Sequence, residues 1–515
     1  MFEKPKLKLK KFYFHPITVF IVLSFLVVLL SGLLSLLQMQ ATYNTVNIYT
    51  LAKESNLVAV ENLLSFDGIK FLISNATKNF LSFAPLGTLL ISLLGLTIAE
   101  STGFIETLTK RHISKIPRYT LTFLILFLAI ISSLINEVGY AILIPLVALI
   151  YFINNRNPIL GIVTAFCGVS FGYGVSIFVG SMEVSLIDYT KYAAMQVDPN
   201  IHISLTSNLI FIIVTSIILS IVGTLVIEKI IAPRIGKYKK EEEQKHIEAE
   251  KYGKRGMRLA LIVAIIMLLS TIYSLIPGLP MSGLLLDMNE NTYLGQLFGE
   301  QSYFQDGFTF IISLFFMLAG IAYGIGSKTI KNDKEIIENS SRKFYNIGSI
   351  FILMFFASQF IAVFRKTNIG TVITAWLVNL LDNMPVSGLP LILITLLFIA
   401  LSNMVLTSPA SKWMMFSPVV VPMFMHSSIS PQFAQIVLRA GDSMTKGFTP
   451  LLASFVIYIG YLNVYNLHKN KPYTISEALK MVRPYFLLIS LTWILLVIGW
   501  YLIGLPIGPG VYPTI

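Results

Sequence analysis

The sequence NMVLTSPASKW at residues 403–413 is followed by RAGDS at residues 439–443 and then by Pro450. It lies in a strongly apolar chain, yet it contains Lys412, Arg439 and Asp442. Charges at membrane depth are costly, so they usually face a cavity or a partner and mark a transport path. Pro, Gly, Asn and Ser around them interrupt helices, and non-helical backbone is tolerated at that depth where it lines a cavity. We expect this stretch to form half of a substrate and cation site.

The composition is that of a membrane protein with many spans. The chain has 515 residues, of which 55% are hydrophobic and 12% charged, and its mean hydropathy is +0.75. Such a chain is a polytopic membrane protein rather than a soluble enzyme. Its net charge of +12 first reports orientation, because lysine and arginine favour cytoplasmic loops. We therefore expect no nucleic-acid partner, and a cell-membrane protein whose lysine-rich N-terminus lies in the cytoplasm before a first span at 17–38.

The order of apolar segments predicts an all-α fold with about nine transmembrane helices and two re-entrant helical hairpins. The first half, residues 1–227, would contain a hairpin at 119–155 and a crossing at 158–182 that is broken around GVSFGYG, residues 168–174. A charged cytoplasmic linker follows at 228–258. The second half, residues 259–515, would contain a hairpin at 385–428 and a crossing at 431–467, broken between 439 and 450.

Six residues of the first half recur 273 positions later. They are Pro145, Val147, Pro158, Gly168, Ser170 and Gly174, which return as Pro418, Val420, Pro431, Gly441, Ser443 and Gly447. Prolines and glycines at a fixed offset constrain backbone shape rather than hydrophobicity alone. The charges around the hairpins predict that the first enters from the cytoplasm and the second from outside. This is an inverted-topology repeat, in which sites form at discontinuous helices near the middle of the bilayer.

Each half combines a hairpin-tip asparagine with a serine of the broken crossing. Asn136 would accompany Ser170, and Asn403 would accompany Ser443 together with the carboxylate of Asp442. Sodium needs oxygen ligands, which unwound helices supply. We therefore predict two candidate sodium sites, with the proton as the alternative coupling ion. Capping of the hairpin tips and hydrogen bonding at helix ends are the structural alternatives, and they can coexist with ion binding.

Arg439 and Asp442 are three positions apart, so they would share one face of a helix. The guanidinium would bind a substrate carboxylate through its planar fork, balanced by Asp442, unless the two form a purely structural pair. Lys412 would add positive potential or extend to the interface. Trp413 would stack on an aromatic substrate or belong to an interfacial belt. Glu183 would carry protons or bind a cation, unless it is exposed in a loop.

Other classes of function are less consistent with the sequence. The run GSKT at residues 326–329 lacks the first glycine and the order of a phosphate-binding loop, so ATP-driven transport is not expected. An intramembrane enzyme is the weaker alternative, because we find no nucleophile beside a base. A channel is weaker still, because no repeated pore motif is evident.

Along nearly its whole length the chain resembles the p-aminobenzoyl-glutamate transporter (AbgT) family. The resemblance rests on an ordered series of short motifs: Lys78-Asn79-Phe80, Phe83 to Thr88, Gly139-Tyr140, Ile144-Pro145-Leu146, Asn403, Ser408, Lys412-Trp413, Arg439, Gly441-Asp442-Ser443 and Thr449-Pro450. Glutamate stands at 137 and 183 where the family has aspartate, and Pro409 interrupts its small-residue run.

The resemblance implies a homodimeric secondary transporter in a lipid membrane that acts on a small-molecule substrate. It implies uptake of p-aminobenzoyl-glutamate or related folate-type aromatic carboxylates, with ion-driven efflux of sulfonamide-type antimetabolites as the alternative. Family functional positions carry over to Asn403, Trp413, Arg439, Asp442 and Pro450. We also expect Glu183, Ser408 and Lys412 to contact the substrate.

Overall fold

The computed structural model describes residues 14–47, 50–135, 137–238, 253–299, 301–345, 347–468 and 470–515. Three predictions concern residues outside these ranges. They are the cytoplasmic position of the lysine-rich N-terminus, the role of Asn136, and the charged centre of the predicted linker at 239–252.

Long apolar helices dominate the described residues and confirm a mostly helical, polytopic membrane fold. Eight helices are long and apolar enough to cross a membrane by length and composition: α1 (Pro16–Leu36), α4 (Ala84–Ser101), α6 with its 3-10 extension η2 (Arg118–Ile135), α10 with η3 and α11 (Leu209–Ile235), α12 (Gly253–Tyr273), α14 (Tyr303–Ser327), α16 (Gly348–Lys366) and α22 (Ile475–Ile503). The predicted total of nine crossings and the side from which each enters stay predictions.

Shorter helices occupy the two regions where hairpins and broken crossings were expected. In the first region these are α6 (Arg118–Ile131), α7 (Val138–Ile153), α8 (Pro158–Phe171) and α9 (Ser181–Met195). In the second they are α18 (Gly388–Asn403), α19 (Pro409–His426), α20 (Pro431–Lys446) and α21 (Phe455–Val464). The two sets follow the same order with similar spacing. That they form an inverted repeat stays a prediction.

Helices α8 and α20 begin in the same way. Each has proline as its first residue, which suits that position because its fixed φ is helical and its missing N–H is not needed there. The side chain of Asn157 caps α8 by accepting from the Ile159 amide, and Ser430 caps α20 by accepting from the Phe433 amide. Every residue of both helices is buried, so any charge on them lies inside the protein.

Both crossings break later than expected. Helix α8 continues to Phe171, and α20 remains helical through Arg439 and Asp442 to Lys446. The polar side chains of α20 find partners on other segments, so they do not compete with the helical hydrogen bonds of the backbone. The irregular segments are residues 172–180 and 447–454, and we call them the first break and the second break.

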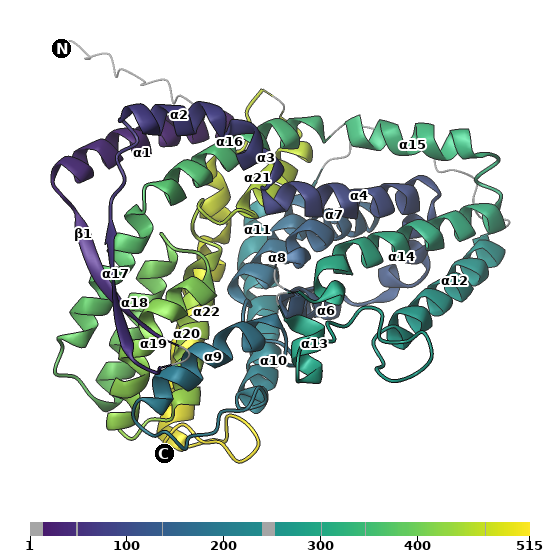
Figure 1. Cartoon of the computed structure of the whole chain (residues 1–515). Coiled ribbons are helices and arrows are strands. Elements are labelled where there is room, and N and C mark those ends of the chain that lie inside the picture. The colour runs from purple at the N-terminus through teal and green to yellow at the C-terminus, as the bar shows by residue number, and fades with distance from the viewer. Residues whose placement is uncertain are drawn as a thin grey trace, which may run out of the picture.

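A β-hairpin stands apart from the all-α expectation. Strands β1 (Gln40–Val46) and β2 (Lys53–Ala59) pair antiparallel, with Gln40 opposite Ala59. Helix α17 (Ile369–Asp382) holds this hairpin, since the Trp376 indole donates to the Gln40 carbonyl at 3.2 Å and the Asn379 amide donates to the Thr42 carbonyl at 2.8 Å. Figure 1 shows β1 along the edge of the molecule beside α17.

The remaining elements are short or peripheral: α2 (Phe66–Ser74), α3 (Ala76–Leu81), α5 (Phe104–Arg111), η1 (Ile113–Lys115), α13 (Tyr293–Phe298) and α15 (Asp333–Tyr345). Figure 1 places α17, α18, α19, α20 and α22 on one side and α4, α12 and α14 on the other, with α8 and α10 between them. The buried helices α8 and α20 pack against each other, so segments of the two halves meet in the centre.

Candidate functional site

One polar face of α20 carries the charges of the centre. It consists of Arg439, Asp442, Ser443 and Lys446, spaced three, four and seven residues from the first, so their side chains project from the same side of the helix. All four are completely buried. Buried charges require partners, and other segments of both halves supply them.

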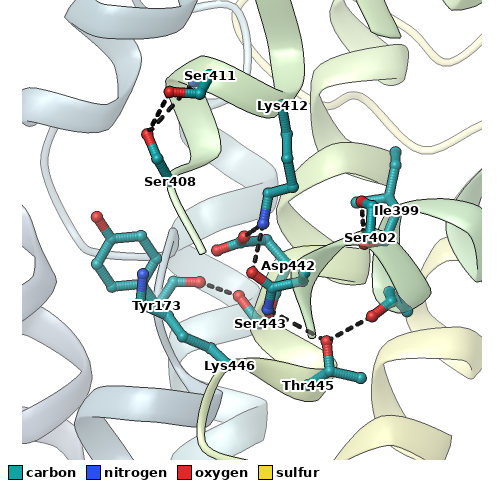
Figure 2. A network of polar contacts seen from close by, with 12 residues as sticks. Tyr173, Ile399, Ser402, Ser408, Ser411, Lys412, Asp442, Ser443, Thr445 and Lys446 are labelled. Carbon is teal, nitrogen blue, oxygen red and sulfur yellow. Dashed lines mark hydrogen bonds and ion pairs between the residues drawn. The ribbon is translucent and has the colours of Figure 1, made fainter. Parts of the chain in front are cut away.

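Asp442 forms an ion pair with Lys412 of the second hairpin (Figure 2). The Lys412 ammonium also donates to the Oδ1 atom of Asn403, and all three residues are fully buried. The Asn403 amide nitrogen donates to the Asp442 carbonyl at 2.7 Å and to Thr445 Oγ1 at 3.1 Å. These two bonds turn the amide oxygen of Asn403 toward the ammonium. The other carboxylate oxygen of Asp442, Oδ2, has no hydrogen-bond partner among the described residues.

Arg439 forms an ion pair with Glu183 of the first half, so the structural alternative of a pair with Asp442 is not observed. Its Nη1 atom donates to Glu183 Oε1 at 2.5 Å and to the Gly174 carbonyl at 2.8 Å. Two neighbouring donors of the guanidinium, Nε and Nη2, are buried without a hydrogen-bond partner in the described part of the chain. The fork therefore presents one free edge.

The carboxylate of Glu183 is fixed by hydrogen bonds at the start of α9. It lies in the first turn of α9, where its Oε2 atom accepts from the Gly180 amide at 2.7 Å while Oε1 pairs with Arg439. Only 7% of the residue is exposed, which rules out the exposed-loop alternative. A carboxylate at a helix N-terminus is also favoured by the helix dipole, so this anion is stabilised from both sides.

Gly174 allows the first break to approach Arg439. Its φ of +86° lies in the left-handed region, where a side chain is disfavoured. A Cβ atom there would come within 2.8 Å of the Met182 sulfur. Glycine therefore lets the backbone turn so that its carbonyl points to the guanidinium.

The far end of the polar face contacts the tip of the first hairpin. The Lys446 ammonium lies 3.3 Å from Glu137 Oε1 and 3.5 Å from the centre of the Tyr173 ring, and Figure 2 shows it directed toward that ring. Ser454 of the second break donates to Glu137 Oε2 at 2.8 Å. Ser443 donates to the Tyr173 carbonyl. Both breaks and the first hairpin thus meet around Lys446.

The structure gathers only part of the predicted cation ligands. Asn403 and Asp442 lie together, but the hydroxyl of Ser443 is directed to the first break. In the other predicted pair, Ser170 accepts from the Tyr140 hydroxyl at 3.0 Å, while Asn136 is outside the described residues. Both sodium sites therefore stay predictions, and the oxygen set around Lys412 is the better formed.

Trp413 is an interior residue, so the interfacial alternative is wrong. It is fully buried, and its indole N–H donates to Thr190 Oγ1 at 2.8 Å. Gln435 donates to the same oxygen at 2.6 Å and accepts from Asn208 at 2.9 Å. Sequence reasoning missed this network, although Gln435 lies one helical turn before Arg439. Thr190, from α9, had no local signal.

Ser408 and Pro450 lie at the margins of the cluster. Ser408 is exposed and caps α19, because its hydroxyl accepts from the Ser411 amide at 3.3 Å. Pro450 is partly buried in the second break. These contacts do not bring Ser408 or Pro450 to the three ion pairs. In the charged cluster, sequence reasoning assigned no site role to Tyr173, Gly174 and Thr445, although the first two lie in the predicted break at 168–174. They contribute carbonyls, a ring and a hydroxyl.

The charges of the cluster balance. Three cations, Lys412, Arg439 and Lys446, face three carboxylates, Asp442, Glu183 and Glu137, in one-to-one pairs. Neutralised charges lower the cost of burial. Chemically, the arrangement offers a guanidinium edge for an anion and an oxygen set for a cation. Arg439 and Asp442 lie on α20, and Asn403 lies at the end of α18.

The comparisons with known proteins agree with one another. Residues 10–515 match the AbgT putative transporter family. The p-aminobenzoyl-glutamate transport protein of Escherichia coli (strain K12) is 30% identical over 501 residues, which cover 97% of this chain and 94% of that protein. The solved YdaH transporter of Alcanivorax borkumensis is 29% identical, with a TM-score of 0.49, and covers 96% of this chain and 100% of its own.

A second solved structure, MtrF of Neisseria gonorrhoeae, is 30% identical with a TM-score of 0.48. The match covers 97% of this chain and 98% of MtrF, which is described as illuminating a class of antimetabolite efflux pumps.

Proposed function

Because the chain belongs to the AbgT transporter family, we propose that it moves an aromatic carboxylate of the p-aminobenzoyl-glutamate class across a cell membrane, driven by a cation gradient. The E. coli relative is named for transport of p-aminobenzoyl-glutamate. A residue set that combines a guanidinium with a buried cation–carboxylate pair suits such a cargo. The charged side chains of the cluster are paired with one another, and the Arg439 edge remains available to a ligand. This arrangement suits binding and release of an intact molecule.

The free edge of Arg439 is the observation that carries this proposal. Nε and Nη2 are adjacent donors with a fixed fork geometry, and they are buried without a protein partner among the described residues. A carboxylate accepts two parallel bonds from such a fork. Leaving charged donors unpaired in the interior is unfavourable. The substrate carboxylate would supply the two acceptors that Nε and Nη2 lack.

The cation would act at the oxygen set of Asn403 and Asp442. Sodium is the proposed co-substrate, because the amide and carboxylate oxygens are hard ligands held in fixed positions. The proton is the alternative, carried by Asp442 or Glu183. Two hairpins and two breaks meeting at one cluster would let these segments move as a unit during transport.

Efflux of sulfonamide-type antimetabolites is the second candidate. An ionised sulfonamide also presents two oxygens next to an aromatic ring, so the same edge of Arg439 would bind it. The two candidates differ in cargo and direction rather than in the residues used. We propose in addition that the functional unit is a homodimer, as the family resemblance implies, and light scattering of the purified protein in detergent would show a mass of two chains.

Flux into proteoliposomes tests the proposal. With an imposed sodium or proton gradient, the wild type should concentrate labelled p-aminobenzoyl-glutamate above equilibrium, or export a labelled sulfonamide against its gradient. R439A should lose this activity while retaining the elution profile of the wild type, and exposed Arg365 provides the control R365A. Movement of substrate only down its own gradient, indifferent to both ions, would reject coupling. Conversion of substrate without flux would indicate an enzyme.

A further inference from the structure

The Lys412 side chain occupies a position that the sequence did not assign to it. Lys412 lies in the first turn of α19, and its ammonium contacts the Oδ1 atoms of Asn403 and Asp442. The residue is completely buried, so it does not extend to the interface. Figure 2 shows the Lys412 ammonium directed toward Asp442, with which it forms an ion pair.

The oxygens around this ammonium are arranged as for a bound cation. The amide oxygen of Asn403 is turned inward because its nitrogen donates to the Asp442 carbonyl and to Thr445 Oγ1. Asp442 contributes Oδ1, while its buried Oδ2 atom has no hydrogen-bond partner in the described ranges. A lysine ammonium is a compact point charge, so it can stand where a small monovalent cation would stand.

The Lys412 ammonium also completes the charge balance of the cluster. With Lys412 in place, the three buried cations and three carboxylates of the cluster cancel. Without it, Asp442 would be an unpaired carboxylate in the interior, which is strongly unfavourable. A carrier that must change conformation without cargo therefore benefits from a cation that belongs to the chain itself.

We propose that Lys412 is a tethered cation, which neutralises Asp442 in the empty carrier and is displaced from the Asn403–Asp442 oxygens when the transported sodium ion binds. This inference rests on the cation-coupled transport proposed above. It makes Lys412 a coupling residue rather than a ligand of the substrate. Once the ammonium is displaced, the sodium ion neutralises Asp442 in its place.

Two measurements on reconstituted protein test this role. The first is sodium binding, measured as the rise in melting temperature with sodium concentration. Choline replaces sodium so that the ionic strength stays constant. In K412Q the competing ammonium is absent, so the half-saturating sodium concentration should fall at least about tenfold relative to the wild type. K334Q changes a lysine whose side chain is 79% exposed and is the control that should match the wild type.

The second measurement is the ratio of net flux to exchange. Net flux requires the empty carrier to return, whereas exchange with substrate and sodium on both sides does not. Because K412Q leaves Asp442 unpaired during the empty return, its ratio should fall at least about tenfold. A substrate ligand would change both modes alike and leave the ratio constant. The double variant K412Q/D442N has no charge to neutralise, so it should regain net flux relative to D442N but lose stimulation by sodium.

The outcomes separate this inference from the proposed function. A sodium-coupled wild type with an unchanged ratio and unchanged sodium affinity in K412Q overturns the role of Lys412 alone. A wild type driven by protons and indifferent to sodium also overturns it while preserving coupled transport. A wild type indifferent to both ions removes the proposed coupling together with this inference. If K412Q does not fold, K412M, which has a similar volume, replaces it in both measurements.

Discussion

The tips of the two hairpins differ more in their chemistry than in their backbone. The second tip is sealed, because Asn403 and Lys412 are fully buried and bond to Asp442 of α20, within the same half. The first tip reaches across the molecule, where Glu137 forms an ion pair with Lys446 and accepts a hydrogen bond from Ser454 of the other half, and 35% of its side chain remains exposed. Similar helices therefore present a closed ion pair in one case and an accessible one in the other.

This difference teaches that Pro158 and Pro431 begin two similar helices, while the charged side chains are divided unequally between the halves. The second half contributes the charged face of α20 and the sealed pair. The first half contributes partners for that face, namely the carbonyls of Tyr173 and Gly174 and the carboxylate of Glu183. We expect changes at the sealed pair to have large effects and changes at the accessible pair to have small ones.

The largest effect should come from D442N. It leaves the buried ammonium of Lys412 without its carboxylate, and breaking a buried pair costs about 3–5 kcal/mol. Cation-driven flux in proteoliposomes should therefore fall at least about 100-fold. The matched control is D382N, since Asp382 is an exposed carboxylate at the end of α17. Wild-type flux in D442N would show that the sealed tip has no special role.

R439K should have the next largest effect. Lysine keeps the charge but lacks the planar fork, so the substrate loses a bidentate contact. We expect the KM for p-aminobenzoyl-glutamate to rise about 10- to 100-fold, in line with the loss of hydrogen bonds to a charged group. R365K, at an exposed arginine, controls for the substitution. An unchanged KM would place the substrate away from the free edge.

G174A tests whether the first half acts through its backbone. An alanine at φ +86° is disfavoured by about 1–2 kcal/mol, and its Cβ atom would approach the Met182 sulfur to 2.8 Å. The carbonyl that meets Arg439 should shift, reducing flux about tenfold and lowering the melting temperature. G499A is the control, because a Cβ atom at Gly499 meets nothing within 4 Å. Equal behaviour of the two variants would contradict the account of the first break.

E137Q should have the smallest effect. Although Lys446 is buried, water reaches the Glu137 side chain, which is 35% exposed, and the ammonium keeps its contact with the Tyr173 ring. We therefore expect the substitution to cost about 1 kcal/mol. Flux should fall by about fivefold at most, with an unchanged KM for the substrate. E61Q, which removes the exposed pair between Glu61 and Lys366, is the comparison. A loss as large as that of D442N would erase the proposed difference between the two tips.

The sequence contained enough to predict the fold class, the two sets of short helices and the family. Pro158 and Pro431 start α8 and α20 as their type predicts, and the charges of α20 identified a polar face in an apolar chain. The β-hairpin was missed although residues 40–46 and 53–59 contain β-branched and aromatic side chains in short runs. In a chain that is 55% hydrophobic, the pattern of long apolar segments favoured a prediction of helical spans alone.

The partners of the buried charges could not be read from the sequence. Arg439 and Asp442 share a helical face, which predicted a local pair, but Glu183 and Lys412 approach that face from other segments. Spacing along one helix reports which side chains are neighbours on it, whereas tertiary packing decides which distant carboxylate arrives. The same reason explains why the sequence did not pair Lys412 with Asp442 and why it gave no signal for Thr190.

Equilibrium binding in R439K and D442N tests most directly that one helix holds two separate sites. Titration of purified protein would give the affinities for p-aminobenzoyl-glutamate and for sodium in each variant. We predict that R439K weakens substrate binding with little change in sodium binding, and that D442N removes sodium binding and with it the effect of sodium on substrate affinity. If each variant shifted both affinities equally, or if neither shifted any, α20 would not carry a substrate site and a cation site side by side.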